Sequence, residues 1–132
     1  MQKYKHMYGA EAAIWERWLS RNKNRFQRFE YDVHVGRLYP EHETLEGNWR
    51  KGAESVYQKR IDAIGYQAGL ITIFEVKPHA GLGAVGQIIG YLSLYEDEFQ
   101  PAEEVVGAII TEIVDPNVRR ILEEHNIEVY VV

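Results

Sequence analysis

Three charged residues near the middle of the chain, Asp62, Glu75 and Lys77, have the types and spacing that metal-assisted hydrolysis requires. Glu75 and Lys77 stand two residues apart at the end of the apolar run 70–74, so in a strand both point to one face. If the turn at 65–69 is centred between residues 68 and 69, Asp62 lies directly across an antiparallel pair from Glu75. Two carboxylates at about 5 Å repel each other unless a divalent cation lies between them. Oxygen ligands with room for water suit Mg²⁺ or Mn²⁺, and Lys77 would orient water or stabilise a developing phosphoryl charge.

The same residues fit a second interpretation. Glu75 can pair with Lys77, and Asp62 with Arg60, as ordinary ion pairs on an exposed face. A slip of one residue in the strand register would also move Asp62 to the other face and remove the site. Spacing alone leaves both interpretations open.

The elements that must position these residues follow from hydrophobic periodicity. We expect helices and strands in the order α-β-β-β-α-β-α-β, which predicts an α/β fold with a mixed sheet flanked by helices. The expected elements are a helix over 8–22, a strand over 29–35, a long loop over 37–54, strands over 56–65 and 70–77, a helix from the glycines at 81–86 to about Tyr95, a strand over 105–113, a helix from Asp115-Pro116 to about Asn126 and a strand over 127–132.

The expected core includes apolar stripes on two helices. Trp15 and Trp18 share the apolar side of the first helix, which predicts core or dimer contacts. In the second long helix the predicted stripe consists of Val85, Ile88, Ile89 and Leu92. The 132 residues are expected to form a single domain, because one domain typically takes roughly 100–200 residues.

Composition excludes several classes of catalytic and metal-binding chemistry and indicates the cellular compartment of the protein. With no cysteine, the chain has no thiol nucleophile, Cys-ligated metal or disulfide. The five histidines are scattered, which disfavours a zinc site. No apolar segment approaches the roughly 20 residues that span a bilayer, and the first ten residues do not resemble a signal peptide, so the expected location is cytoplasmic.

Charge is divided unevenly along the chain. The formal net charge is -5, from 20 acidic and 15 basic residues, which by itself disfavours a nucleic-acid partner. Residues 1–60, however, carry twelve Lys and Arg against eight Asp and Glu, whereas residues 61–132 carry three against twelve. The basic half is either a solvated helix face or a surface that contacts a polyanion.

The sequence around the three charged residues resembles the PD-(D/E)XK nuclease superfamily. The resemblance rests on Asp62, on Glu75-Val76-Lys77 after a short hairpin, and on an A-V-x-Q-x-x-x-Y helix that contains Gln87 and Tyr91. It covers about residues 60–132 and is strongest to NucS/EndoMS-like, RecB-like and archaeal Holliday junction resolvase-type nuclease cores. Ile61 stands in place of the family's proline, Pro78 follows Lys77 where NucS-like proteins often have Arg, and no part of the sequence corresponds to a DNA-clamping N-terminal domain.

The resemblance implies a restriction-endonuclease-like fold and a Mg²⁺-dependent DNA endonuclease, with Mn²⁺ able to substitute. Its substrates would be branched, flapped or mismatched DNA in repair or recombination, and a homodimer would permit paired cuts. Asp62, Glu75 and the Val76 carbonyl would hold the metal, and Lys77 would position water. Either Glu11 or Glu16 would be the helix-borne acid, and Glu11 is preferred because it follows the helix start. Glu11 would then serve a second metal ion or its waters. Gln87 and Tyr91 would line the site.

DNA contacts are expected from the basic residues of the first half and from residues near the site. Trp49 lies beside two basic residues in the long loop and is a candidate for stacking on a base. His79 could touch a phosphate or simply be a solvated loop residue. The expected DNA-binding residues are Arg17, Arg21, Arg25, Arg28, Trp49, Arg50, Lys51, Arg60 and His79.

Two other functions compete with the nuclease. The segment GLGAVG (81–86) matches the G-x-G-x-x-G dinucleotide-binding pattern between a strand and a helix. It is disfavoured because four residues, 77–80, separate Val76 from the first glycine and because the preceding strand ends in Glu75 and Lys77. A catalytically silent DNA-binding or scaffold module on the same fold is the other alternative, and it would not need Asp62, Glu75 and Lys77 together.

Overall fold

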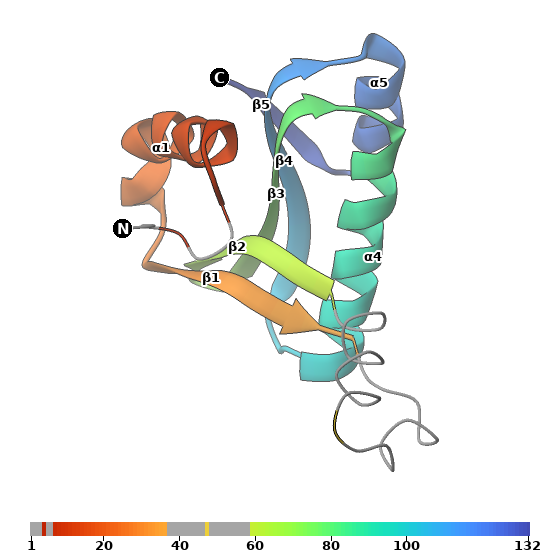
Figure 1. The fold of residues 1–132 in the computed structure, drawn as a ribbon. Coiled ribbons are helices and arrows are strands. Elements are labelled where there is room, and N and C mark those ends of the chain that lie inside the picture. The colour runs from red at the N-terminus through yellow and green to blue at the C-terminus, as the bar shows by residue number, and fades with distance from the viewer. Residues whose placement is uncertain (1–3, 5–6, 37–46, 48–58) are drawn as a thin grey trace.

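A five-stranded mixed sheet forms the centre of the computed structural model, which describes residue 4, residues 7–36, residue 47 and residues 59–132 (Figure 1). Its strands lie side by side in sequence order: β1 (Arg28–Val35), β2 (Lys59–Gln67), β3 (Leu70–Ala80), β4 (Glu104–Val114) and β5 (Glu128–Val131). The first three strands are antiparallel to one another, and β4 and β5 run parallel to β3.

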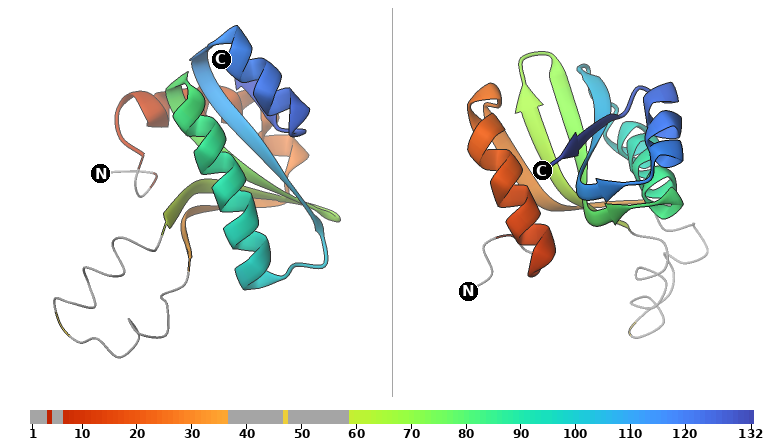
Figure 2. Two further views of the ribbon diagram at one scale, coloured as in Figure 1. Left: turned by 90° about the vertical axis from the view of Figure 1, so that its right-hand side faces the viewer. Right: turned by 90° about the horizontal axis from the view of Figure 1, so that it is seen from above.

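Helices cover both faces of the sheet (Figures 1 and 2). One face packs against α1 (Ala10–Asn22), which leads into the short 3₁₀ helix η1 (Lys23–Arg25). The other face packs against α4 (Leu82–Phe99) and α5 (Pro116–Glu124). Parallel neighbours need crossover connections, and α4 and α5 supply them. The predicted order of elements and the mixed α/β sheet are therefore confirmed.

Two local signals read from the sequence position these elements. The hairpin between β2 and β3 is shorter than the predicted turn over 65–69, because Gln67 already pairs with Leu70 and only Ala68 and Gly69 turn. Gly69 has φ 73°, which a side chain rarely adopts. Asp115 begins α5 as predicted, since its Oδ1 accepts a hydrogen bond from the Asn117 amide at 2.7 Å.

An aromatic core fills the space between the sheet and α1. Trp15 and Trp18 are at most 1% exposed and stack with their ring centroids 5.1 Å apart. Phe74 of β3 lies 4.8 Å from Trp18 and 5.3 Å from Trp15. The predicted core role of both tryptophans is confirmed. Their large apolar rings anchor α1 across β3 and β4.

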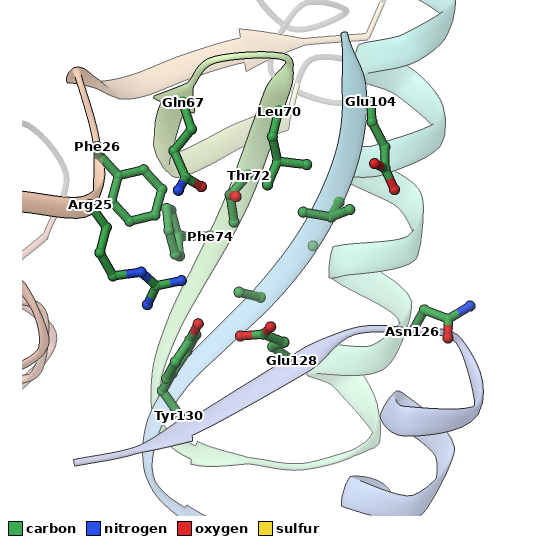
Figure 3. A pocket seen from close by; sticks show the side chains of 13 residues that line it. Arg25, Phe26, Gln67, Leu70, Thr72, Phe74, Glu104, Asn126, Glu128 and Tyr130 are labelled. Carbon is green, nitrogen blue, oxygen red and sulfur yellow. The ribbon is translucent and has the colours of Figure 1, made fainter. Parts of the chain in front are cut away.

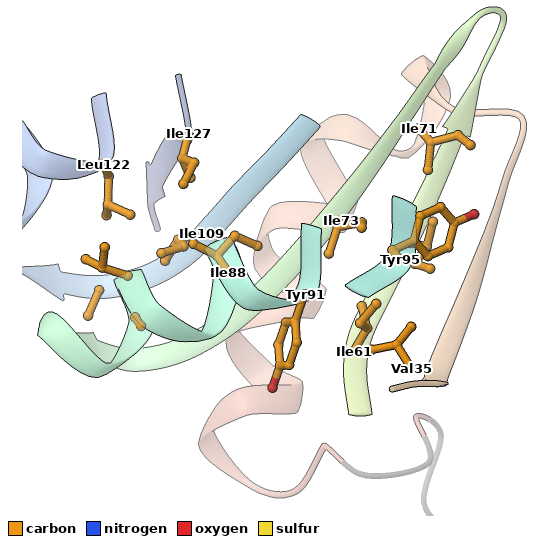
Figure 4. Packing of buried hydrophobic residues seen from close by; sticks show 14 of the residues in the cluster. Val35, Ile61, Ile71, Ile73, Ile88, Tyr91, Tyr95, Ile109, Leu122 and Ile127 are labelled. Atoms are coloured by element: carbon orange, nitrogen blue, oxygen red, sulfur yellow. The ribbon is translucent and has the colours of Figure 1, made fainter. Parts of the chain in front are cut away.

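An aliphatic core lies on the other face, under α4 and α5 (Figure 4). Ile88 of α4 meets Ile109 of the sheet there, and Leu122 of α5 is fully buried beside them. The prediction that Ile89 belongs to this stripe is wrong, since it is 37% exposed. The inward face of α4 advances by three or four residues per turn, so Ile89 lies beside it rather than on it.

Glycine lets α4 lie close to the sheet, and this glycine belongs to the sheet rather than to the helix. A Cβ on Gly83 or Gly86 would meet nothing within 4 Å, so neither permits close packing. A Cβ on Gly107 of β4 would lie 2.9 Å from Ile88 Cγ1 and 3.1 Å from Leu92. The absence of a side chain at Gly107 of β4 therefore permits the close packing of α4 on the sheet. None of the described helices is long and apolar enough to cross a bilayer.

The regular alternation predicted for β1 holds only for its first half. Phe29 and Tyr31 pack against the aromatic core, whereas Val33 and Val35 belong to the aliphatic core on the other face. Between them Asp32 has φ 55°, a left-handed conformation. A single residue of this kind reverses the face on which the following side chains lie, and the sequence pattern did not predict it.

Candidate active site

The hairpin register places Asp62 opposite Glu75, as the sequence predicted. The ladder pairs Ala63 with Phe74 and would next pair these two acids. In place of main-chain pairing, Asp62 Oδ2 accepts a hydrogen bond from the Val76 amide at 2.8 Å. The side chain of Asp62 therefore occupies the space between β2 and β3, where their ladder ends.

Both carboxylates are buried, which excludes the interpretation as exposed ion pairs. Asp62 is 5% exposed and Glu75 is 3% exposed. Glu75 Oε2 is buried without a hydrogen-bond partner. Lys77 Nζ lies 3.9 Å from Glu75 Oε1, and Arg60 pairs with Asp32 instead of Asp62. A buried carboxylate oxygen without a donor is costly unless a proton or a cation accompanies it.

The surroundings of Glu75 favour its protonated form. Burial has the largest effect and, together with the charge and hydrogen bond of Asp62, raises the pKa of Glu75 to about 9. Lys77 opposes this shift, and Glu11 adds to it. Perturbed carboxyls of this kind concentrate at catalytic and metal-binding sites.

Two helices bring further candidates to the carboxylates. Burial, followed by the charges of Glu75 and Asp62, raises the pKa of Tyr91 to about 12, and Gln87 hydrogen-bonds to Tyr91 one turn away. On α1, the charge of Glu11 acts on Glu75. Glu16 instead accepts a hydrogen bond from the Tyr4 hydroxyl. Of these two acids, Glu11 is the one whose charge acts on Glu75.

The donor set fits a hard divalent cation. Asp62 and Glu75 offer carboxylate oxygens, one of them without a partner. The Val76 amide faces β2, and the carbonyl of a strand residue faces the same neighbour as its amide. No cluster of three or more His, Cys, Asp or Glu side chains arranged for a metal occurs in the described part of the chain. Water would therefore have to complete the coordination, which Mg²⁺ tolerates well.

The predicted DNA-binding residues that the structure describes lie on several elements of the fold. Arg60 lies two residues before Asp62 on β2, and His79 is exposed near the end of β3. Arg17 pairs with Glu112 of β4 at 2.8 Å, and Arg21 is exposed on α1. Trp49, Arg50 and Lys51 lie outside the described residues.

Arg25 and Arg28 lie at the other end of the sheet. Arg28 pairs with Tyr66 on β2 and stacks its guanidinium 3.7 Å from that ring. Tyr66 is four residues from Asp62, or roughly 13 Å along a strand. Arg25 and Arg28 therefore do not lie beside the carboxylate pair. Register, which charge counting does not include, separates them from the carboxylates.

A cavity of about 230 Å³ also lies away from the carboxylates (Figure 3). Its floor includes Thr72 and Phe74, whose side chains occupy the face of β3 opposite Glu75. Of the predicted site residues, only Arg25 lines it. The cavity is therefore separate from the candidate active site.

The glycine segment does not form a phosphate-binding loop. β3 continues to Ala80, beyond its predicted end at residue 77, so the four residues between Val76 and Gly81 belong to the strand and do not separate it from the glycines. Only Gly81 separates β3 from α4, and Gly83 and Gly86 already lie within the helix. With no loop to surround a pyrophosphate, the dinucleotide interpretation loses its structural basis.

Sequence reasoning missed Asp32, which holds Arg60 through two hydrogen bonds of 2.6 and 2.8 Å. The alternation of β1 predicted only that Asp32 faces away from the core. No sequence signal specified its left-handed backbone, although Asp is among the residues that tolerate that conformation.

No family model matches the sequence, and no curated protein matches it. Solved structures do share its fold. A repair endonuclease from Pyrococcus abyssi matches with TM-score 0.54 at 19% identity, over 97% of this chain and 49% of that chain. EndoMS in its apo form matches with TM-score 0.56 at 18% identity, over 97% and 48% of the two chains. An EndoMS–dsDNA complex matches with TM-score 0.55 at 16% identity, over 100% and 48%.

This chain spans about half the length of each of these proteins. The similarity extends over nearly all of its own residues and includes the strands that carry the carboxylate pair. At this level of identity the matches establish architecture. The chain therefore has the restriction-endonuclease-like α/β fold that is also found in the NucS/EndoMS repair endonucleases.

Proposed function

We propose that the chain is a metal-dependent endonuclease that hydrolyses phosphodiester bonds in DNA. The observation that carries this proposal is the buried pair of Asp62 and Glu75, in which one Glu75 oxygen has no partner. A structural ion pair would satisfy that oxygen, whereas a cation-binding site leaves it available. The matching structures are described as a repair endonuclease and as EndoMS bound to double-stranded DNA, which supports DNA as the substrate.

The residues around the pair have distinct roles in this proposal. Asp62, Glu75 and the Val76 carbonyl would hold Mg²⁺, or Mn²⁺ in its place, and such a cation would supply a water of lowered pKa and charge stabilisation at the phosphoryl oxygens. Lys77, 3.9 Å from Glu75, orients the attacking water. Glu11 holds solvent on the α1 side of the site.

Gln87 and Tyr91 line the site from α4. Tyr91 is 8% exposed, and its pKa is raised to about 12. Its hydroxyl therefore stays protonated at neutral pH and donates hydrogen bonds instead of acting as a base. Gln87 fixes the orientation of that hydroxyl through their hydrogen bond.

The substrate we propose is DNA recognised by its structure: branched, flapped or mismatched, as in repair or recombination. Base-sequence reading needs an element inserted into the major groove. In the described residues, both faces of the sheet are covered by helices that pack into its cores. Paired cuts on such substrates would be made by a homodimer.

Cleavage assays on matched substrates test the proposal. Plasmid, single-stranded, flapped, mismatched and four-way junction DNA are incubated with Mg²⁺, with Mn²⁺ or with EDTA. We expect cleavage with either cation, no cleavage in EDTA, and loss of about three orders of magnitude in rate in Glu75→Gln. Glu103→Gln, which changes an exposed glutamate of the same chemistry, is the matched control.

Each failure has a specific meaning. Cleavage that persists in EDTA, or in Glu75→Gln, would refute the metal-dependent mechanism. DNA binding without cleavage on any substrate would establish the catalytically silent module instead. Light scattering of the protein with and without DNA measures whether it acts as a dimer.

A further inference from the structure

Asp32 of β1 and Arg60 of β2 form an ion pair near the level of Asp62 in the sheet. Asp32 Oδ1 accepts from Arg60 Nε at 2.6 Å, and Oδ2 accepts from Nη2 at 2.8 Å. The register of β1 and β2 brackets Asp62 between the pairs Tyr31–Ala63 and Val33–Ile61, so Asp32 lies at the level of Asp62 on the neighbouring strand. Neighbouring strands are about 4.8 Å apart, and Arg60 lies about 6.6 Å along β2 from Asp62.

The backbone of Asp32 adopts an unusual conformation for this contact. Its φ of 55° is left-handed, and a non-glycine residue pays about 1 kcal/mol or more for it. The Asp32 side chain is 8% exposed, whereas that of Arg60 is 53% exposed. The Asp32 carboxylate is thus buried, whereas the Arg60 guanidinium that it binds is exposed at the surface.

This geometry fixes the orientation of the Arg60 guanidinium but uses only some of its hydrogen-bond donors. The two hydrogen bonds use Nε and one hydrogen of Nη2, so the remaining guanidinium N–H groups are left for other acceptors. A guanidinium held by a carboxylate loses little further rotational freedom when it binds a phosphate. His34 lies 3.7 Å from Asp32 and is half exposed, which adds a second polar group to the same rim.

We propose that Asp32 is a positioning residue that fixes Arg60 to contact a DNA phosphate beside the cleaved bond. The proposal rests on the proposed nuclease function, because it supplies that site with a substrate-orienting group. A positioning role for Asp32 and a general basic patch predict opposite effects on DNA affinity when the acid is removed. Removing an acid from a DNA-binding surface ordinarily strengthens binding, whereas removing Asp32 would weaken it.

Asp32→Gly tests this directly. Glycine accepts φ 55° without strain, so the strand keeps its course while Arg60 loses its carboxylate. We expect DNA affinity to fall about tenfold, KM to rise in parallel and kcat to change by less than about threefold, because one charge-assisted contact is lost from binding. Glu30→Gln removes an acidic charge from the same strand, away from Arg60, and is the electrostatic control.

A double-mutant cycle tests whether Asp32 changes DNA affinity through Arg60. If Asp32 acts through Arg60, then Arg60→Ala and the double variant Asp32→Gly/Arg60→Ala bind DNA equally, and each lowers the salt dependence by about one phosphate contact. Arg60→Lys keeps the positive charge but loses the planar pair of guanidinium donors that Asp32 holds. We therefore expect its DNA affinity to fall as in Asp32→Gly. Thermal unfolding of each variant verifies that it folds.

Binding is measured in EDTA by fluorescence anisotropy with a labelled duplex and a four-way junction, so it does not depend on cleavage. Binding by Asp32→Gly as tight as, or tighter than, the wild type would overturn the positioning role, and so would an additive double variant. Wild-type protein that binds DNA but never cleaves it would refute the nuclease function while leaving this contact supported. Wild-type protein that binds no DNA would refute both.

Discussion

The buried Glu75 carboxyl should destabilise the metal-free protein, and Glu75→Gln should relieve this cost. In the unfolded chain the group titrates near its ordinary pKa of 4.5, whereas burial and Asp62 raise its pKa to about 9 in the folded protein. At pH 7 the unfolded state has released this proton and the folded state has kept it. Stability therefore falls as pH rises from about 4.5 to about 9 and is constant above that range.

The size of the effect follows from linkage. Each pH unit between 4.5 and 7 costs about 1.4 kcal/mol, so the full penalty at pH 7 is about 3 kcal/mol. The amide in Glu75→Gln is also buried and recovers only part of this, since an unsatisfied amide costs roughly 1–3 kcal/mol. We expect the variant to be about 1–2 kcal/mol more stable than the wild type at pH 7 without metal, or several degrees in Tm.

Urea unfolding from pH 5 to pH 9 in EDTA measures this difference. The wild type should lose stability along the series, and Glu75→Gln should lose much less. Adding Mg²⁺ should stabilise the wild type progressively and leave the variant almost unchanged. Parallel pH curves for the two proteins, or a variant that is clearly less stable than the wild type at pH 7, would refute the reasoning from burial.

Three further changes probe the machinery and the scaffold. Lys77→Met should lower the cleavage rate by about two orders of magnitude while Mg²⁺ binding, measured by calorimetry, changes little, because Lys77 contacts Glu75 at 3.9 Å and is not a ligand. Gly107→Ala should cost about 1–3 kcal/mol in urea unfolding, because its methyl group would lie 2.9 Å from Ile88; an unchanged stability would mean that α4 shifts freely. Asp115→Ala should cost about 1 kcal/mol through loss of the helix cap, and Asp115→Asn should recover most of it.

Most of the fold was predictable because its signals are local. Alternation and helical periodicity identified every described strand and the three long helices, and Asp115-Pro116 marked the start of α5. The register that places Asp62 opposite Glu75 was predicted for a turn centred between residues 68 and 69, and the structure has this turn at Ala68 and Gly69. Local sequence therefore identified the two acids, and the observed turn fixed their register across the hairpin.

Other features depend on contacts between residues distant in sequence. The close packing of α4 comes from Gly107 of β4 rather than from glycines of the helix itself. The pairing of Arg60 is a second case, because Asp32 of β1 holds its guanidinium through two hydrogen bonds. Neither outcome can be read from spacing, because each depends on which side chain fills a space formed by several elements.

At the candidate site, too, some features follow from local sequence and others depend on contacts between distant residues. Spacing along the chain predicts that two acids and a lysine lie at one end of a hairpin. The burial of Glu75 with an unpartnered oxygen, and the pairing of Arg60 with Asp32 instead of Asp62, arise from packing between elements distant in sequence. Periodicity assigns a residue to a face, but burial and pairing depend on neighbouring strands and helices. The left-handed turn at Asp32, which reverses the faces of β1, is the clearest case.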